Sequence, residues 1–192
     1  MRTAVVFLNL AIVWGAGATS VVPFTIQKLS QKSQAVVHGR VVAVESKNSK
    51  RYAQVEVLEH VRGVAIPARL EVALLQKGSR AAGWIERVPD AMELRAGEEV
   101  LMFLNRSRSD GRWVPVGLQQ GKYRVLVDRQ GVRRALSWKQ GAINRVSDAD
   151  ILGTPSRTAR ALSAADSGLS EKELEKSQPL SALISEIQGF AQ

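Results

Sequence analysis

The segment "GLQQGK", residues 117–122, contains two spaced glycines followed by a lysine. These residue types bind phosphate in many nucleotide enzymes. A phosphate-binding loop needs four residues between its glycines and a Ser or Thr after the lysine, but this chain has three residues there, and then Tyr123. Such a loop also opens a helix, whose N-terminus donates to the phosphate. The following "KYRVLVD" instead alternates in the manner of a strand. We therefore do not interpret this segment as a phosphate site.

Other residues able to do chemistry are few. The two histidines, His38 and His60, lie on neighbouring predicted strands without the Asp or Glu pattern of a metal site. No serine stands in a G-x-S-x-G elbow, although a Ser–His–Asp triad assembled from distant segments stays open. Glu98 and Glu99 point to opposite faces if they lie on a strand, so they do not act on one bond. The sequence predicts a non-enzyme without cofactor or metal.

Basic residues suggest a binding surface. The chain of 192 residues has a formal net charge of +9, which attracts polyanions such as nucleic acid or anionic lipid. Single-strand binding also needs exposed aromatic side chains, for which Tyr52, Trp113, Tyr123 and Trp138 are candidates. The candidate binding surface consists of arginines on two consecutive predicted loops: Arg106, Arg108 and Arg112 on the first, and Arg129, Arg133 and Arg134 on the second.

The elements that position these residues are predicted to be strands. Apolar and polar residues alternate in "YAQVEVLEHVRG" and "ARLEVALLQKG", while "QAVVHGRVVAVES" and "EEVLMFLN" are nearly continuous apolar runs. We expect a bulge or bend at Gly39, a hairpin loop at "RSRSDGR", and a long connection over residues 78–97. Seven short strands with regular turns favour an all-β barrel or sandwich: residues 34–46, 52–63, 68–78, 98–105, 113–118, 122–128 and 132–138.

Both ends of the sequence differ from this body. Arg2, the apolar run of residues 4–14 and the small residues 16–18 predict a signal peptide over residues 1–18, and hence a secreted or periplasmic protein. An uncleaved anchor, which would add the membrane as a partner, is the alternative. Residues 19–140 are predicted to form the barrel, and residues 141–178 a linker with a marginal helix. Residues 179–192 are predicted to form an amphipathic helix through Leu180, Leu183, Ile184 and Ile187, which we expect to dock on the barrel.

Residues 30–128 resemble a group of uncharacterised exported bacterial proteins, through "SQAVVHGRVVAVES", "RAGEEVLMFLN" and "VPVGLQQGKYRV". Residues 34–63 are more distantly similar to the tissue inhibitors of metalloproteinases and netrin-like modules, which implies a small OB-like antiparallel barrel of about five to seven strands with a C-terminal helical tail. In those inhibitors an N-terminal cysteine chelates the zinc of the protease. This chain has no cysteine, so that mechanism does not transfer.

The resemblance also implies a role for "GLQQGK". Gly117, Gln120, Gly121 and Lys122 form a structural junction, in which two glycines let the chain turn between strands. Lys122 is either a solvated strand residue or a contact at the barrel mouth, and we expect the first.

Together these patterns predict an exported, non-catalytic module that binds an unidentified exported protein. A metalloprotease is the sharpest candidate for that partner. The alternative is a basic surface that binds envelope polyanions or nucleic acid.

Overall fold

The structure is a computed structural model that describes residues 23–48, 50–79, 84–86, 91–138 and 169–190. The predicted signal peptide and most of the predicted linker lie outside these residues. The described elements are α1 (Ile26–Lys32), β1 (Ala35–Lys47), β2 (Lys50–Gly63), β3 (Arg69–Ser79), β4 (Trp84–Glu86), β5 (Glu99–Arg106), β6 (Trp113–Pro115), the 3-10 helix η1 (Leu118–Gly121), β7 (Lys122–Val127), β8 (Arg133–Ser137), α4 (Glu171–Glu175), β9 (Gln178–Pro179) and α5 (Leu180–Gly189).

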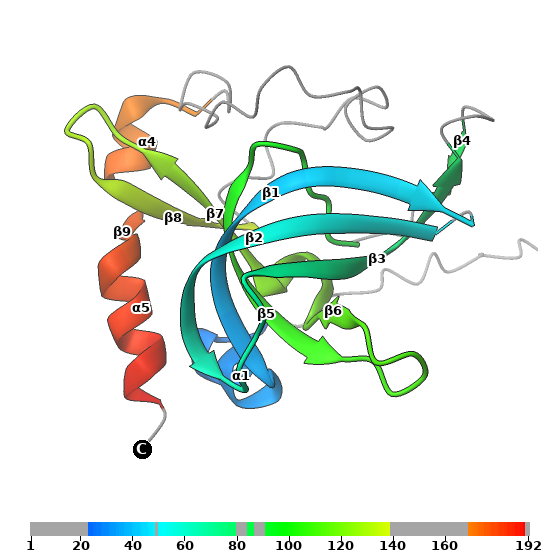
Figure 1. The fold of residues 1–192 in the computed structure, drawn as a ribbon. Coiled ribbons are helices and arrows are strands. Elements are labelled where there is room, and N and C mark those ends of the chain that lie inside the picture. Colours follow the sequence, from blue (N-terminus) through cyan, green and yellow to red (C-terminus); the bar gives the residue numbers. More distant parts are fainter. Residues whose placement is uncertain (1–22, 49, 80–83, 87–90, 139–168, 191–192) are drawn as a thin grey trace, which may run out of the picture.

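Five strands close into a barrel in the order β1-β2-β3-β6-β5, with β5 pairing back to β1 (Figure 1). This confirms the prediction of a small all-β barrel with a helical tail. The pairing of β3 with β6 is parallel and is recorded at Val72 and Trp113, so the barrel is not antiparallel throughout. Strands β7, β8 and β9 extend the sheet beyond β5. Strand β4 lies in the predicted long connection. Its three residues are too few to show the alternation that identifies a strand in the sequence.

Alternating side chains of the barrel strands fill its interior. Val37, Val55, Val72 and Met102 belong to this core and are almost completely buried. The register of β1 against β2 shifts at Gly39, as the sequence predicted, and again between Val41 and Ala43. A Cβ atom at Gly39 would lie 2.7 Å from the backbone oxygen of Glu56, so only glycine fits this close approach without a shift.

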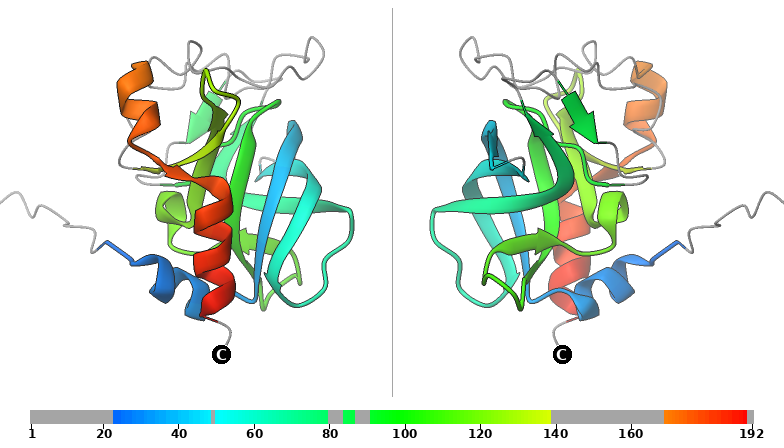
Figure 2. Two further views of the ribbon diagram at one scale, coloured as in Figure 1. Left: turned by 90° about the vertical axis from the view of Figure 1, so that its left-hand side faces the viewer. Right: turned by 90° about the vertical axis from the view of Figure 1, so that its right-hand side faces the viewer.

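A second apolar cluster lies outside the barrel, where α1 and α5 cover one face of the sheet (Figure 2). Leu183 and Ile187 of α5 are fully buried against Val36, Leu101 and other residues of this face. A helix of this length is unstable alone, and burial of its apolar side offsets that weakness. The C-terminal helix therefore docks on the barrel, as the sequence predicted.

The short helix α4 occupies the position of the predicted marginal helix. Ser170 and Glu173 form a reciprocal capping box at its start, and Leu174 is buried against Leu126 and Leu136. No helix of the described residues has the length and apolar character needed to cross a bilayer.

Candidate binding surface

The six arginines of the predicted surface lie in or beside two loops at opposite ends of the molecule (Figure 1). Arg108 and Arg112 lie in the β5–β6 connection, with Arg106 at the end of β5. Arg129 lies in the turn of the β7–β8 hairpin, with Arg133 and Arg134 at the start of β8. The fold therefore does not unite the two groups in one patch, because β5 and β7 run antiparallel and their outgoing loops leave from opposite ends.

The arginines of the β7–β8 hairpin are held by carboxylates of the protein itself. Nε of Arg134 lies 2.8 Å from Oδ2 of the buried Asp128. Nε of Arg133 lies 3.1 Å from Oε1 of Glu99, and Nε of Arg129 lies 3.4 Å from Oε2 of Glu171. These pairs lower the positive charge that the hairpin presents to a ligand.

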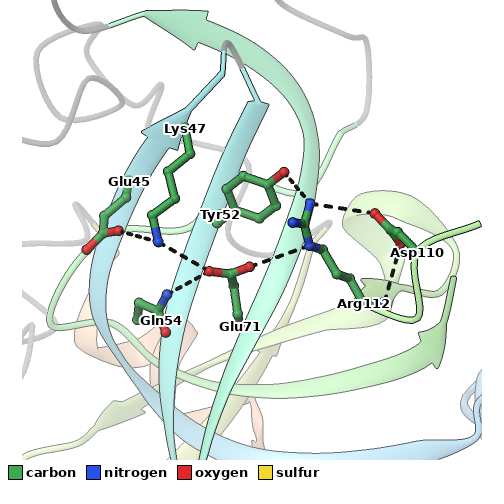
Figure 3. Close-up of polar contacts among 7 residues, drawn as sticks. All are labelled: Glu45, Lys47, Tyr52, Gln54, Glu71, Asp110 and Arg112. Atoms are coloured by element: carbon green, nitrogen blue, oxygen red, sulfur yellow. Dashed lines mark hydrogen bonds and ion pairs between the residues drawn. The ribbon is translucent and has the colours of Figure 1, made fainter.

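Arg112 is the centre of a network on the outer face of β1, β2 and β3 (Figure 3). Its Nη1 donates to the hydroxyl of Tyr52 at 2.6 Å, and its guanidinium lies 4.8 Å from the centre of the Tyr52 ring. Its Nε and Nη1 lie 3.7 Å from Glu71 and 3.6 Å from Asp110, respectively. Arg112 therefore connects the β5–β6 loop to the sheet and covers Tyr52, which is buried.

Glu71 extends the same network toward the tip of the β1–β2 hairpin (Figure 3). Its Oε2 accepts hydrogen bonds from Gln54 at 3.0 Å and Lys47 at 3.5 Å, and Lys47 also pairs with Glu45 at 3.1 Å. The hydrogen bond to Glu45, and then the charges of Glu45 and Glu71, raise the pKa of Lys47. In the loop, hydrogen bonds from Ser107 and from the backbone of Arg112 lower the pKa of Asp110. The face thus carries fixed charges of both signs.

An exposed leucine adds an apolar element to this face. Leu75 lies four residues beyond Glu71 on β3, so both side chains point outward, and 52% of Leu75 is exposed. The period-two pattern of "RLEVALL" places Leu70, Val72 and Leu74 inward, where they belong to the core, and Glu71 and Leu75 outward. This alternation is the sequence signal that identifies Glu71 and Leu75 as surface residues.

Arg106 and Arg108 differ from the paired arginines. Both are exposed, and neither forms an ion pair with a residue that the structure describes. The guanidinium of Arg106 lies 5.0 Å from the centre of the Trp113 ring. Trp113 itself is buried, as is Tyr52, so neither offers a free ring to a nucleic-acid base.

The "GLQQGK" segment forms a tight turn that contacts two other parts of the chain. Gly117 adopts a left-handed conformation with φ of 69°, and a Cβ atom at Gly121 would lie 1.9 Å from the carbonyl oxygen of Val116. The side-chain oxygen of Gln120 accepts a hydrogen bond from the backbone of Phe24, and that of Gln119 from the backbone of Glu93. The turn therefore joins Phe24, which precedes α1, to the segment before β5.

Lys122 is buried, so the expectation that it is solvated is wrong. Its Nζ donates to the backbone oxygen of Glu93 at 2.6 Å and to Oε1 of Glu98 at 3.0 Å. Glu98 is buried as well and lies 3.6 Å from Nε of Arg124. The sequence could not show that Lys122 is buried, because its partners Glu93 and Glu98 lie more than twenty residues earlier in the chain.

His38 and Glu99 form a second buried pair that sequence analysis missed. Nε2 of His38 lies 2.9 Å from Oε1 of Glu99, so this nitrogen carries the proton that the carboxylate accepts. The hydrogen bond from His38 and the charges of His38, Arg133 and Arg40 lower the pKa of Glu99 against the opposing effect of burial. His60 is exposed and lies apart from this pair, within hydrogen-bonding distance of the backbone oxygen of Val64.

These arrangements give no specific support to a catalytic or metal site. Within the described part of the chain, no group of three or more His, Cys, Asp and Glu residues is placed to hold a metal ion. The carboxylate of Glu99 is engaged by His38, Arg40 and Arg133. The best-defined exposed arrangement is the mixed-charge face of β1–β3.

The fold places this chain among small β-barrel proteins. Comparison with known proteins gives no further assignment: no protein-family model, no curated protein and no solved structure matches it.

Proposed function

We propose that the protein is an exported, non-catalytic module that binds another protein through the outer face of β1–β3. We name this face the network face and define it by Glu45, Lys47, Gln54, Glu71, Leu75 and Arg112. The five barrel strands and the helical tail agree with an OB-like module, a type of barrel that binds ligands on its strand face and adjoining loops.

The observation that carries this proposal is the alternation of paired charges on a face of the sheet that also exposes Leu75. Exposed ion pairs contribute only about 0–1 kcal/mol each to stability, so the network is poorly explained as a stabilising device. Charges of both signs held in place favour a partner with complementary charges, and an apolar side chain among them supplies area to bury. A uniform polyanion would meet Glu45, Glu71 and Asp110 as repulsive groups.

The partner that the inhibitor resemblance implies is a metalloprotease of the secreted or periplasmic compartment. The chain lacks the cysteine of those inhibitors, so we propose binding through the network face and no chelation of the protease zinc. The alternative of polyanion binding has less support at the β7–β8 hairpin, because its arginines are paired within the protein.

The test is affinity capture by the full chain, tagged at its C-terminus, from exported fractions washed at high salt. The variant Leu75→Lys is compared with Val127→Lys, which changes an apolar side chain of similar exposure, 44%, on β7. We expect a protein that the parent and Val127→Lys retain through the wash and that Leu75→Lys loses.

Equal retention by both variants would place the interface elsewhere on the molecule. Recovery of nucleic acid or envelope polymer alone, with release that steepens as salt rises, would support the polyanion alternative, because counterion release scales with the phosphates contacted.

A further inference from the structure

Three segments distant in the sequence meet around Gln34 at one end of the barrel. Its backbone N–H donates to Oδ1 of Asn105 at 2.7 Å, and its side-chain oxygen accepts from the backbone of Arg106 at 2.8 Å. Its backbone oxygen accepts from Val64 at 2.9 Å, and Asn105 donates to the backbone oxygen of Lys32 at 2.9 Å. These bonds fix α1, the β2–β3 connection and the β5–β6 connection to one another.

We name the surface of these segments the basic end and define it by residues 24–34, 62–69 and 105–112. Both Figure 1 and Figure 2 place the three segments together at the lower end of the molecule. They contain one acidic residue, Asp110, and seven basic residues: Lys28, Lys32, Arg62, Arg69, Arg106, Arg108 and Arg112. Asp110 pairs with Arg112, so the remaining charge of this end is strongly positive.

The basic end also carries an apolar loop. Residues 64–68, "VAIPA", have no polar side chain and stand between Arg62 and Arg69. Val64 is 52% exposed, and Ala65, Pro67 and Ala68 are exposed as well. Ile66 packs against the barrel core, and Arg62 donates to the backbone oxygen and hydroxyl of Ser30 at 2.8 Å. The loop is thus held in place with its apolar residues in solvent and cations at both ends.

We propose that the basic end docks on the surface of an anionic lipid bilayer. Anionic headgroups attract Lys and Arg near the surface, by a free energy equivalent to about fivefold in partitioning for each cation. The exposed apolar residues of the loop can enter the headgroup region while the flanking arginines contact the phosphates.

The position of the chain's apolar N-terminal run favours a bilayer over an acidic protein or nucleic acid. The apolar residues 4–14 precede α1, and α1 belongs to the basic end. During export, or as the uncleaved anchor that is the alternative to a signal peptide, this run would bring this end of the barrel close to lipid. Nucleic acid is disfavoured because Trp113, the aromatic residue next to Arg106, is buried.

The experiment measures partition of the purified full chain into vesicles of phosphatidylglycerol and phosphatidylcholine, and into vesicles of phosphatidylcholine alone. The double variant Lys28→Glu and Arg108→Glu is compared with Lys172→Glu and Lys176→Glu, which makes the same charge change on and beside α4, at the other end (Figure 1). All four side chains are exposed, so we expect each variant to fold, as circular dichroism will check. Every variant keeps residues 1–22, so any contribution of the apolar run to partition is equal in all.

We expect the parent to prefer the anionic vesicles, and the Lys28 and Arg108 variant to lose roughly 25-fold or more of that preference. The α4 control should keep it, and added salt should weaken it in the parent. A further variant, Val64→Asp, should also lower partition relative to Val127→Asp.

Three results would overturn the proposal. One is equal partition of the parent into anionic and neutral vesicles. Another is an equal loss in both double variants, which would indicate net charge alone. The third is retention on polyglutamate or an oligonucleotide without partition into vesicles, which would assign the basic end to an acidic polymer.

Discussion

At the scale of single residues, buried charges add contacts between strands that the apolar clusters also join. Glu99 of β5 is buried beside His38 and Arg40 of β1 and Arg133 of β8, so one carboxylate links the barrel to the strand that supports the C-terminal helices. Removing one charged partner leaves the remaining buried charges unpaired. The resulting loss of stability is larger than the net stabilisation that the intact cluster provides.

The lowered pKa of Glu99 predicts a loss of stability in acid. A carboxyl group whose folded pKa lies below its unfolded value stabilises the protein above that unfolded value, which is near 4.5, and the stabilisation is lost as pH falls through the folded pKa. We expect Glu99→Gln to lower the free energy of unfolding at pH 7 by about 1–3 kcal/mol and to flatten its decline below pH 4.5. Urea unfolding of parent and variant from pH 7 to pH 3 measures both effects. A variant with the parent's acid dependence would show that other carboxyl groups dominate it.

At the scale of elements, close backbone contacts define the turn from β6 through η1 to β7, a segment in which the sequence has no periodic pattern. Gly117 and Leu118 both have positive φ, 69° and 58°, and Gly121 approaches the backbone of Val116 too closely for any side chain. The glycines were interpretable from the sequence as turn residues, whereas the burial of Lys122 was not.

This contact predicts that Gly121→Ala is strongly destabilising. The new Cβ atom would lie 1.9 Å from a backbone oxygen, and backbone moves less readily than a side-chain end, so we expect a cost of about 3 kcal/mol. Gly189→Ala is the matched control, because its Cβ meets nothing within 4 Å at the end of α5 and should be neutral or stabilising by up to about 1 kcal/mol. Thermal unfolding of both variants provides the comparison. Equal midpoints would contradict the close approach at Gly121.

At the scale of the whole molecule, the helices pack against the outer side of strands whose inner side lines the barrel. The outer cluster combines α1, α5 and residues of five strands, β1, β2, β5, β7 and β8, and the strands β1 and β5 also line the barrel interior on their other side. The helices therefore cannot leave without exposing one face of the barrel wall.

We accordingly expect Leu183→Ala, at a fully buried position of α5, to destabilise the entire fold by about 2–5 kcal/mol. Circular dichroism and tryptophan fluorescence, to which the buried Trp113 contributes, should report one coincident urea transition in parent and variant. Loss of helical signal at a lower urea concentration than the fluorescence change would mean instead that α5 unfolds separately.

Most of the strands, the last helix and the type of fold were predictable from the sequence, because they depend on local patterns. Alternation placed Val55 and Leu70 inside the barrel, Gly39 marked a bulge, and Leu183 and Ile187 marked the buried side of the last helix. These signals lie within a few residues of one another and need no knowledge of partners.

Which charged side chains are paired within the protein and which stay exposed follows only from the folded chain. The arginines of the β7–β8 hairpin proved to be paired within the protein, while Lys28, Arg62 and Arg108 gather at one end with an apolar loop. Pairing depends on distances between segments far apart in the chain, such as Arg133 with Glu99 or Arg112 with Glu71. No local pattern records those distances, because the paired side chains meet only once the barrel has closed.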